Sequence, residues 1–239
     1  MMINILWDIG GHLGSSDINQ CEKETDLGVL TNNKLSPTEH QKNVVSKASQ
    51  RLGLVKRVSE LVKCPLKKKN LYVSLVRSIF EHCSQVWRPT SDSSLLKFER
   101  LQKRATKWIF GEPEASYDHD MYIEKLKKID VLPMAQKFLY NDLKLFHKIF
   151  YETTPIKLPK FLQRYLPELH DRRTTRQQTK RDKTDIICTE DPRVDLFKNC
   201  YFYRCHIDWN SLPQDLRDIP DNNTFSSRLK EHLWKQLET

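Results

Sequence analysis

Apolar side chains recur every three or four residues along most of the chain, and this period predicts amphipathic helices. The first predicted helix begins at Ser36-Pro37-Thr38-Glu39, where Ser36 caps, Pro37 takes the first helical position and Glu39 completes a capping box. It extends to about Leu61, and its apolar positions are Val44, Val45, Ala48, Leu52, Val55, Val58 and Val62.

Two more helices follow at once. One begins at Pro65 and ends at Arg88-Pro89, because a residue before proline disfavours the helical conformation. Its apolar stripe is Leu71, Leu75, Ile79, Cys83 and Val86 or Trp87. The next is capped by Ser93 or Ser94 and stopped by Gly111. Its buried stripe is Phe98, Leu101, Ala105 and Trp108.

The second half of the chain is less regular. A shorter helix is expected over residues 117–128, and Pro133 begins a strong helix that extends to about Glu152. Ile186–Cys188 reads as a short strand, residues 197–209 fit a strand or a helix, and Thr224 caps a final helix. The pattern predicts a mainly α protein: a helical bundle with a C-terminal extension of helix and irregular chain, including one or two short strands.

The chain has 239 residues, of which 38% are hydrophobic and 10% aromatic, and this composition argues against disorder. We divide it into residues 1–33, a partly disordered N-terminal segment, residues 34–152, a helical domain, and residues 153–239, a C-terminal extension. No apolar run approaches the roughly 20 residues of a membrane helix, and residues 1–6 do not read as a signal peptide. We therefore expect an intracellular protein, nuclear or cytoplasmic, that is not secreted and has no membrane partner.

Positive charge is concentrated in two blocks. Residues 34–110 carry 11 Lys and 6 Arg against 5 acids, and residues 157–183 carry nine basic residues against three acids. Residues 1–33, in contrast, carry one Lys against five acids. Residues 170–185 contain no apolar side chain and predict an exposed basic loop. The two blocks suggest a surface for a polyanion, although a solvated helix face rich in Lys has the same composition.

One basic pattern has a helical period. Lys97, Arg100, Arg104 and Lys107 follow the apolar stripe of the third helix one residue back, so they form a cationic stripe about 100° round the helix. Such a stripe can lie along a phosphate backbone or serve as an ordinary solvated face.

Catalytic and metal-binding signatures are missing from the sequence. It contains no GxSxG, HExxH or P-loop motif. Asp118-His119-Asp120 is the only candidate for a pair of metal-binding carboxylates, and its position between two predicted helices indicates a helix start instead. The six cysteines are scattered, and Cys200, Cys205 and His206, even with His232, fit a packing role better than a zinc site. We expect free thiols, no cofactor, no metal and no catalysis.

A series of short motifs carries a family resemblance. It begins with Asp26-Leu27-Gly28-Val29-Leu30 and Glu39-His40, and it ends with Trp209-Asn210-Ser211-Leu212-Pro213. Between these lie residues 46–53, 71–77, 80–87, 99–107, 139–149 and 172–176. In this order and at these distances, residues 24–237 resemble the part downstream of the polymerase palm in jockey-like non-LTR (LINE-type) retrotransposon reverse transcriptases.

The resemblance implies a thumb-and-tail fragment of an RNA-directed DNA polymerase. In the family, the metal-binding aspartates of the palm lie upstream of the Asp26-Leu27-Gly28 block, so this chain lacks them and is not expected to be an enzyme. The helical part would hold a template–primer RNA–DNA hybrid through phosphate contacts. The implied contact residues are Lys67, Lys68, Lys69, Arg77, Lys97, Arg100, Arg104 and Lys107, together with Arg172, Arg173 and Arg176 of the basic loop.

Two other readings stay open. The chain can be a domesticated helical module that binds a protein partner through the bare surface that would face the palm, or an unstable pseudogene product. The tryptophans do not decide among these readings, since Trp87 and Trp108 fall on apolar stripes and Trp209 precedes a Leu-Pro turn. We expect all three to be structural rather than base-stacking.

Overall fold

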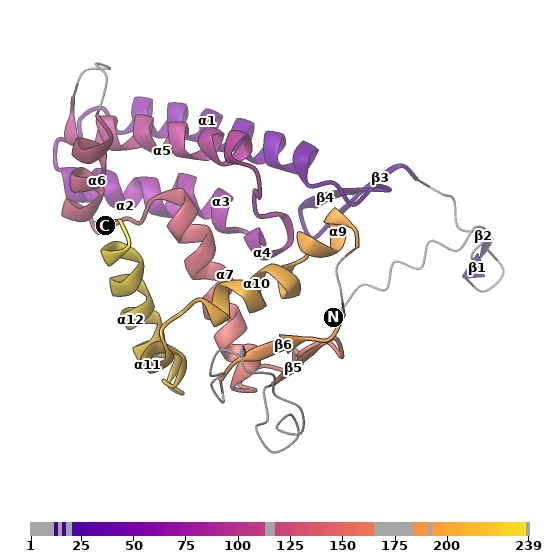
Figure 1. Ribbon diagram of the computed structural model, residues 1–239. Coiled ribbons are helices and arrows are strands. Elements are labelled where there is room, and N and C mark those ends of the chain that lie inside the picture. Colours follow the sequence, from indigo (N-terminus) through magenta and orange to yellow (C-terminus); the bar gives the residue numbers. More distant parts are fainter. Residues whose placement is uncertain are drawn as a thin grey trace.

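The computed structural model describes residues 12–13, 16–17, 21–112, 118–164, 184–190 and 193–237. The described chain is mainly helical, with short antiparallel strand pairs, and this confirms the predicted fold class (Figure 1). The helices of the first part are α1 (Thr38–Val58), α2 (Pro65–Tyr72), the π-helical turn η1 (Val73–Arg77), α3 (Ser78–Glu81), α4 (Ser84–Trp87), α5 (Asp92–Phe110), α6 (His119–Lys128) and α7 (Met134–Phe150). Those of the second part are α9 (Asp195–Lys198), α10 (Tyr201–Asn210), α11 (Gln214–Arg217) and α12 (Asn222–Lys235).

Three strand pairs accompany the helices. β1 (His12–Leu13) pairs with β2 (Ser16–Asp17), β3 (Lys23–Asp26) with β4 (Val29–Asn32), and β5 (Leu162–Arg164) with β6 (Ile186–Cys188). The strand predicted at Ile186–Cys188 is therefore confirmed. Residues 197–209, for which strand and helix were both open, lie in the end of α9 and in α10, with a break at residues 199–200. The β3–β4 hairpin turns at Leu27 and Gly28, both at positive φ, as a two-residue hairpin turn requires.

The predicted second helix is interrupted, and its most deeply buried stripe is shifted by one residue from the predicted one, although Leu71, Ile79 and Cys83 still pack, partly buried, against the core. The buried side chains are Tyr72, Val76 and Phe80, each at most 1% exposed, while Leu75 is 41% exposed. Both sets recur every four residues, and such a stripe drifts round an ideal α-helix of 3.6 residues per turn. The π-helical turn η1 uses one extra residue, so it keeps the Tyr72–Val76–Phe80 stripe in phase with the core. A left-handed Cys83 (φ 50°) then separates α3 from α4.

Several predicted caps also differ. Ser36 makes no capping hydrogen bond to α1, and Glu39 pairs instead with Lys23 at 2.9 Å. Ser91, not Ser93 or Ser94, precedes α5. At α12 the cap is Asp221, whose Oδ2 accepts a hydrogen bond from the Thr224 backbone N–H at 2.7 Å. These are shifts of one to three residues at helix ends, where neighbouring Ser, Thr and Asp compete for the same backbone donors.

Two other ends were placed correctly. Asp118 caps α6, its carboxylate accepting a hydrogen bond from the His119 backbone N–H, as its interpretation as a helix start predicted. Gly111 ends α5 in the left-handed conformation at φ 71°.

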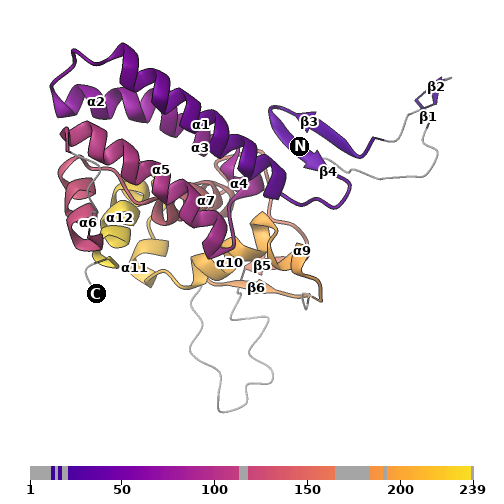
Figure 2. The ribbon, with the colours of Figure 1, turned by 90° about the horizontal axis from the view of Figure 1, so that it is seen from above.

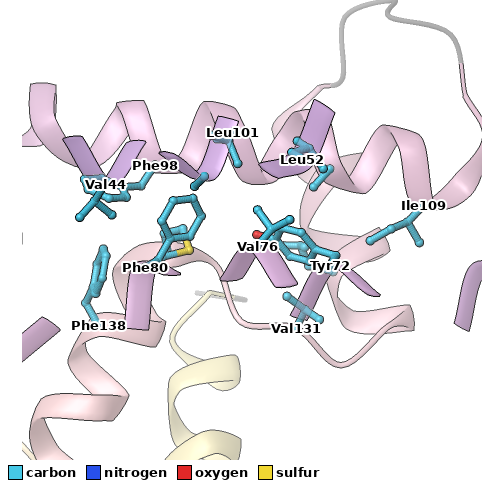
Figure 3. Packing of buried hydrophobic residues seen from close by; sticks show 14 of the residues in the cluster. Val44, Leu52, Tyr72, Val76, Phe80, Phe98, Leu101, Ile109, Val131 and Phe138 are labelled. Atoms are coloured by element: carbon cyan, nitrogen blue, oxygen red, sulfur yellow. The ribbon is translucent and has the colours of Figure 1, made fainter. Parts of the chain in front are cut away.

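Two hydrophobic clusters meet at α7. The first cluster lies among α1, α2, η1, α3, α5, α6 and the start of α7, which contributes Phe138 (Figure 3). The second cluster lies among the later turns of α7, β5, β6, α10, α11 and α12. Trp234 of α12 packs against both clusters. The C-terminal extension is thus packed on the helices.

The tryptophans predicted to be structural are packed inside. Trp87 is 1% exposed and Trp209 is fully buried, while Trp108 is half-buried against the first cluster. Leu212 of the turn that follows Trp209 lies in the same cluster, and aromatic rings surround the indole as well. Trp209 packs against the rings of Phe146, Phe150 and Phe225, and its Nε1 donates to the Thr184 carbonyl at 2.8 Å.

A buried ion cluster joins the two parts. Asp142 of α7 is 0% exposed, and its Oδ2 accepts from Arg88 Nη1 at 3.0 Å and from Arg204 Nε at 3.1 Å. Arg88 also reaches Asp208 Oδ2 at 3.2 Å. Burial raises the pKa of Asp142, while the two guanidinium groups oppose that shift. These contacts link the end of α4 to α7 and α10, which are far apart in sequence.

Candidate nucleic-acid interface

The cationic stripe of α5 faces away from the first cluster. The helix buries Phe98, Leu101, Ala105 and Ile109. Of the four stripe residues, Lys97, Arg100 and Arg104 are exposed and Lys107 is half-buried. The same amphipathic pattern that places the apolar stripe in the core therefore presents the basic stripe on an adjacent face, about 100° away, that is open to solvent.

Helix α1 widens this basic surface. It lies beside α5, and the two helices run in the same direction (Figure 2). Arg104 Nη1 donates to Ser49 Oγ of α1 at 3.5 Å. Lys42 and Lys56 stand seven residues before and after Ser49, which is about two helical turns, so they share its face of α1.

The lysines of α2 meet the other end of α5. Lys67 is exposed, whereas Lys68 and Lys69 are half-buried. Lys68 Nζ donates to the Trp108 carbonyl at 3.0 Å and stands 5.5 Å from the centroid of the Trp108 ring. The Lys68 ammonium group is thus already engaged at the C-terminal end of α5, where it also complements the helix dipole.

Arg77 is wrong as a phosphate contact. It is 3% exposed, its Nη2 donates to the Leu132 carbonyl at 2.9 Å, and its Nε lies 3.1 Å from Glu81 Oε1. A guanidinium group held in this way joins η1 to the segment before α7 and cannot reach a phosphate at the surface. The residues next to Arg77 in the sequence, Val76 and Ser78, do not reveal this burial.

The remaining predicted contacts, Arg172, Arg173 and Arg176, lie outside the described residues. The described interface therefore consists of the α5 stripe with its neighbours on α1 and α2. Lys42 and Lys56 were counted in the sequence analysis only as part of the charge of residues 34–110. Helical periodicity already places them on one face of α1, but only the packing of α1 on α5, which includes the Ser49–Arg104 contact, brings that face beside the stripe.

Carboxylates are sparse around the stripe. Helices α1 and α5 together carry ten Lys and Arg against Glu39, Asp92 and Glu99. Glu99 is turned toward the protein, where it accepts from the Tyr122 hydroxyl and, at 2.9 Å, from the Met134 backbone N–H. Glu39 pairs with Lys23 of β3. Two of the three acids are therefore engaged by other groups, and the potential at this surface is strongly positive.

The described residues hold no group of three or more His, Cys, Asp or Glu side chains that would bind a metal ion. All six cysteines are unpaired, and burial raises the pKa of the Cys205 thiol well above its usual value. No helix within the described ranges is long and apolar enough to cross a membrane. What the described surface offers is ammonium and guanidinium groups, which bind anions.

Comparison of the chain with protein-family models, with curated proteins and with solved structures found no match. The interpretation of this surface therefore depends on the chemistry and arrangement of its own residues.

Proposed function

We propose that the protein is a non-catalytic thumb-and-tail segment of a non-LTR retrotransposon RNA-directed DNA polymerase that binds nucleic acid through the α1–α5 surface. Support comes from the ordered motifs of residues 24–237 and from the mainly helical fold of the described residues. The observation that carries the proposal is the contact of Arg104 with Ser49, since it makes one basic surface from two helices.

The surface suits the phosphate backbone rather than the bases. From Lys97 to Lys107 the stripe spans about 15 Å at 1.5 Å per residue, comparable to roughly four base pairs of duplex at 3.4 Å each. Lysine and arginine along such a length neutralise phosphates, and these contacts position a duplex without reading its sequence. Binding is therefore nonspecific in sequence, and an RNA–DNA hybrid is the ligand that the resemblance implies.

The test measures how the purified chain binds a labelled RNA–DNA hybrid at increasing salt concentration, with fluorescence anisotropy as the readout. Circular dichroism first confirms that the chain has its helical fold. Each phosphate contact adds about 0.7–0.9 to the slope of log affinity against log salt concentration. A variant with Lys97, Arg100, Arg104 and Lys107 all changed to Glu should lose most of the affinity and about 3 units of that slope.

A matched control separates the surface from the net charge. Lys157, Lys160, Arg193 and Arg228 are exposed basic residues outside α1, α2 and α5. Changing these four to Glu alters the net charge equally and should weaken binding much less. Equal losses in the two variants would contradict a specific surface, and primer extension by the purified chain would contradict the non-catalytic part.

Protein binding is a second candidate, favoured by exposed apolar residues near the α1–α2 connection. Val58, Leu61 and Leu66 are 74%, 92% and 61% exposed. Apolar side chains gathered at one end of a surface usually mark an interface. Salt distinguishes the two functions, because apolar association does not weaken as salt rises, whereas phosphate binding does.

A further inference from the structure

A separate pocket of about 440 Å³ lies where the β3–β4 hairpin meets α1 and α3. Lys47 and Asn43 of α1 line it together with His40, His82 and the apolar side chains of Val44 and Ile79. None of the described residues that line this pocket is Asp or Glu. Its lining therefore combines hydrogen-bond donors and a cation with an apolar wall.

Two histidines build the pocket by holding the hairpin in place. The Leu30 backbone N–H donates to His40 Nδ1 at 3.1 Å, and His82 Nε2 donates to the Leu27 carbonyl at 3.0 Å. Val29 of β4 adds a side chain to the first hydrophobic cluster. The hairpin wall is thus anchored through β4 and through its turn.

The same contacts determine which atoms can face a ligand. Because His40 Nδ1 accepts a hydrogen bond, the proton of its neutral imidazole is on Nε2, so the second nitrogen is a donor. Burial, together with the charges of Lys47 and His82, lowers the pKa of His40, which keeps this ring neutral at pH 7. Lys47 is exposed and forms no ion pair within the described residues.

We propose that this pocket binds a phosphomonoester, either of a free nucleotide or of the end of a nucleic-acid strand. Lys47 supplies the charge, and His40 Nε2–H and the Asn43 amide supply further donors, while Val44 and Ile79 contact the organic part of the ligand. A phosphomonoester carries about two negative charges at pH 7, so it gains more from this donor set than a backbone phosphodiester does. The free-nucleotide form is independent of the proposed function, whereas the strand-end form depends on it.

The first experiment uses adenosine 5′-monophosphate as the probe and the histidine ring resonances as the readout. The nucleotide should shift the resonances of His40 and His82, and adenosine should not. Lys47→Met should weaken binding about tenfold, the effect of one charge-assisted hydrogen bond. Lys63→Met is the matched control, because Lys63 is an exposed lysine that neither lines the pocket nor belongs to the α1–α5 surface, and the change should leave nucleotide binding unchanged.

The second experiment compares a 5′-phosphorylated DNA strand with the same strand ending in a hydroxyl group. A preference for the phosphorylated strand that disappears in Lys47→Met identifies a strand end as a ligand, and a response to the mononucleotide alone identifies the free nucleotide. The proposal is overturned if the nucleotide leaves the resonances of His40 and His82 unchanged, or if Lys63→Met and Lys47→Met weaken nucleotide binding equally. If the protein binds the mononucleotide but neither DNA strand, the result would contradict the proposed function and not the pocket.

Discussion

The two hydrophobic clusters share α7 but are held together in different ways. Around the first, local amphipathic helices bury one apolar face and present basic residues on the other. Around the second, a buried carboxylate links distant segments: Asp142 is 0% exposed and is bound by arginines 54 and 62 residues away. The comparison indicates that a binding surface can be built on elements specified locally, while the extension is attached through long-range contacts.

The largest expected effect tests the buried face of the first cluster. Phe80→Ala removes a fully buried ring that packs edge-on against Phe98, and it should destabilise the protein by about 4 kcal/mol. Leu75→Ala, on the face that the sequence analysis had placed inside, should cost less than about 1 kcal/mol. Urea unfolding followed by circular dichroism measures both. Equal losses of stability in the two variants would mean that the predicted stripe through Leu75 is buried as deeply as Phe80.

The next effect tests the attachment of the second region. Asp142→Ala leaves two arginines without their buried partner and should destabilise by about 3 kcal/mol. This is the low end of the usual range, because Arg88 and Arg204 keep 20% and 11% of their side chains exposed. Asp208→Ala removes only the half-exposed partner of Arg88 and should cost about 1 kcal/mol or less. If the two variants lose the same stability, Asp142 is not the centre of the cluster.

A smaller effect should appear in mild acid. Burial is the main cause that lowers the pKa of His40, His147 and His206 from the ordinary value of 6.5. A histidine with a lowered folded-state pKa contributes stability above pH 6.5 that is lost as pH falls toward the folded-state value. Thermal unfolding between pH 7.5 and about 5.5 should therefore show a falling midpoint.

The same titration compares the two regions. Two of these histidines belong to the second region, so His147→Gln/His206→Gln should flatten the pH dependence more than His40→Gln. Asp142, whose pKa is raised, titrates in the opposite sense and is unchanged in all of these variants. If the melting temperature depends less on pH in His40→Gln than in the double variant, the first region, and not the second, carries most of the acid sensitivity.

The smallest effects test local specification in the basic helices. Gly111→Ala places a side chain at φ 71° and should destabilise by about 1 kcal/mol. Gly53→Ala lies inside α1, where the new Cβ would come no closer than 3.9 Å to the end of Arg57, and should stabilise by about 0.5–1 kcal/mol. Urea unfolding measures the change in the free energy of unfolding for each variant. Changes of opposite sign would support local specification of these helices, and changes of the same sign would contradict it.

Much of the first region was predictable because its signals are local. The helix beginning near Pro37, the helix from Pro65 and the stop at Gly111 follow from proline, glycine and periodicity over a few residues. The cationic stripe of α5 follows from the same periodicity. The hairpin at Leu27 and Gly28 was not predicted, and neither was β5, since their partners and supports lie elsewhere in the chain.

Errors arose where two local patterns were equivalent. The stripes through Leu75 and Val76 have the same spacing, and only packing against α1 and α5 selects one of them. Arg77 is adjacent to the buried Val76, whereas the family resemblance had implied a phosphate contact for it. Its burial depends on the Leu132 carbonyl, 55 residues away, which no local pattern reports.

The sequence by itself determined the mainly helical class, the concentration of positive charge in residues 34–110 and the single stripe on α5, because each depends on residues near one another in the chain. Only the tertiary structure decided that Ser49 brings α1 beside that stripe, that Arg77 is interior, and that a hairpin and two helices enclose a pocket around Lys47. The physical reason is that burial and hydrogen-bond partners are properties of chain segments brought together by folding, and periodicity describes one segment at a time.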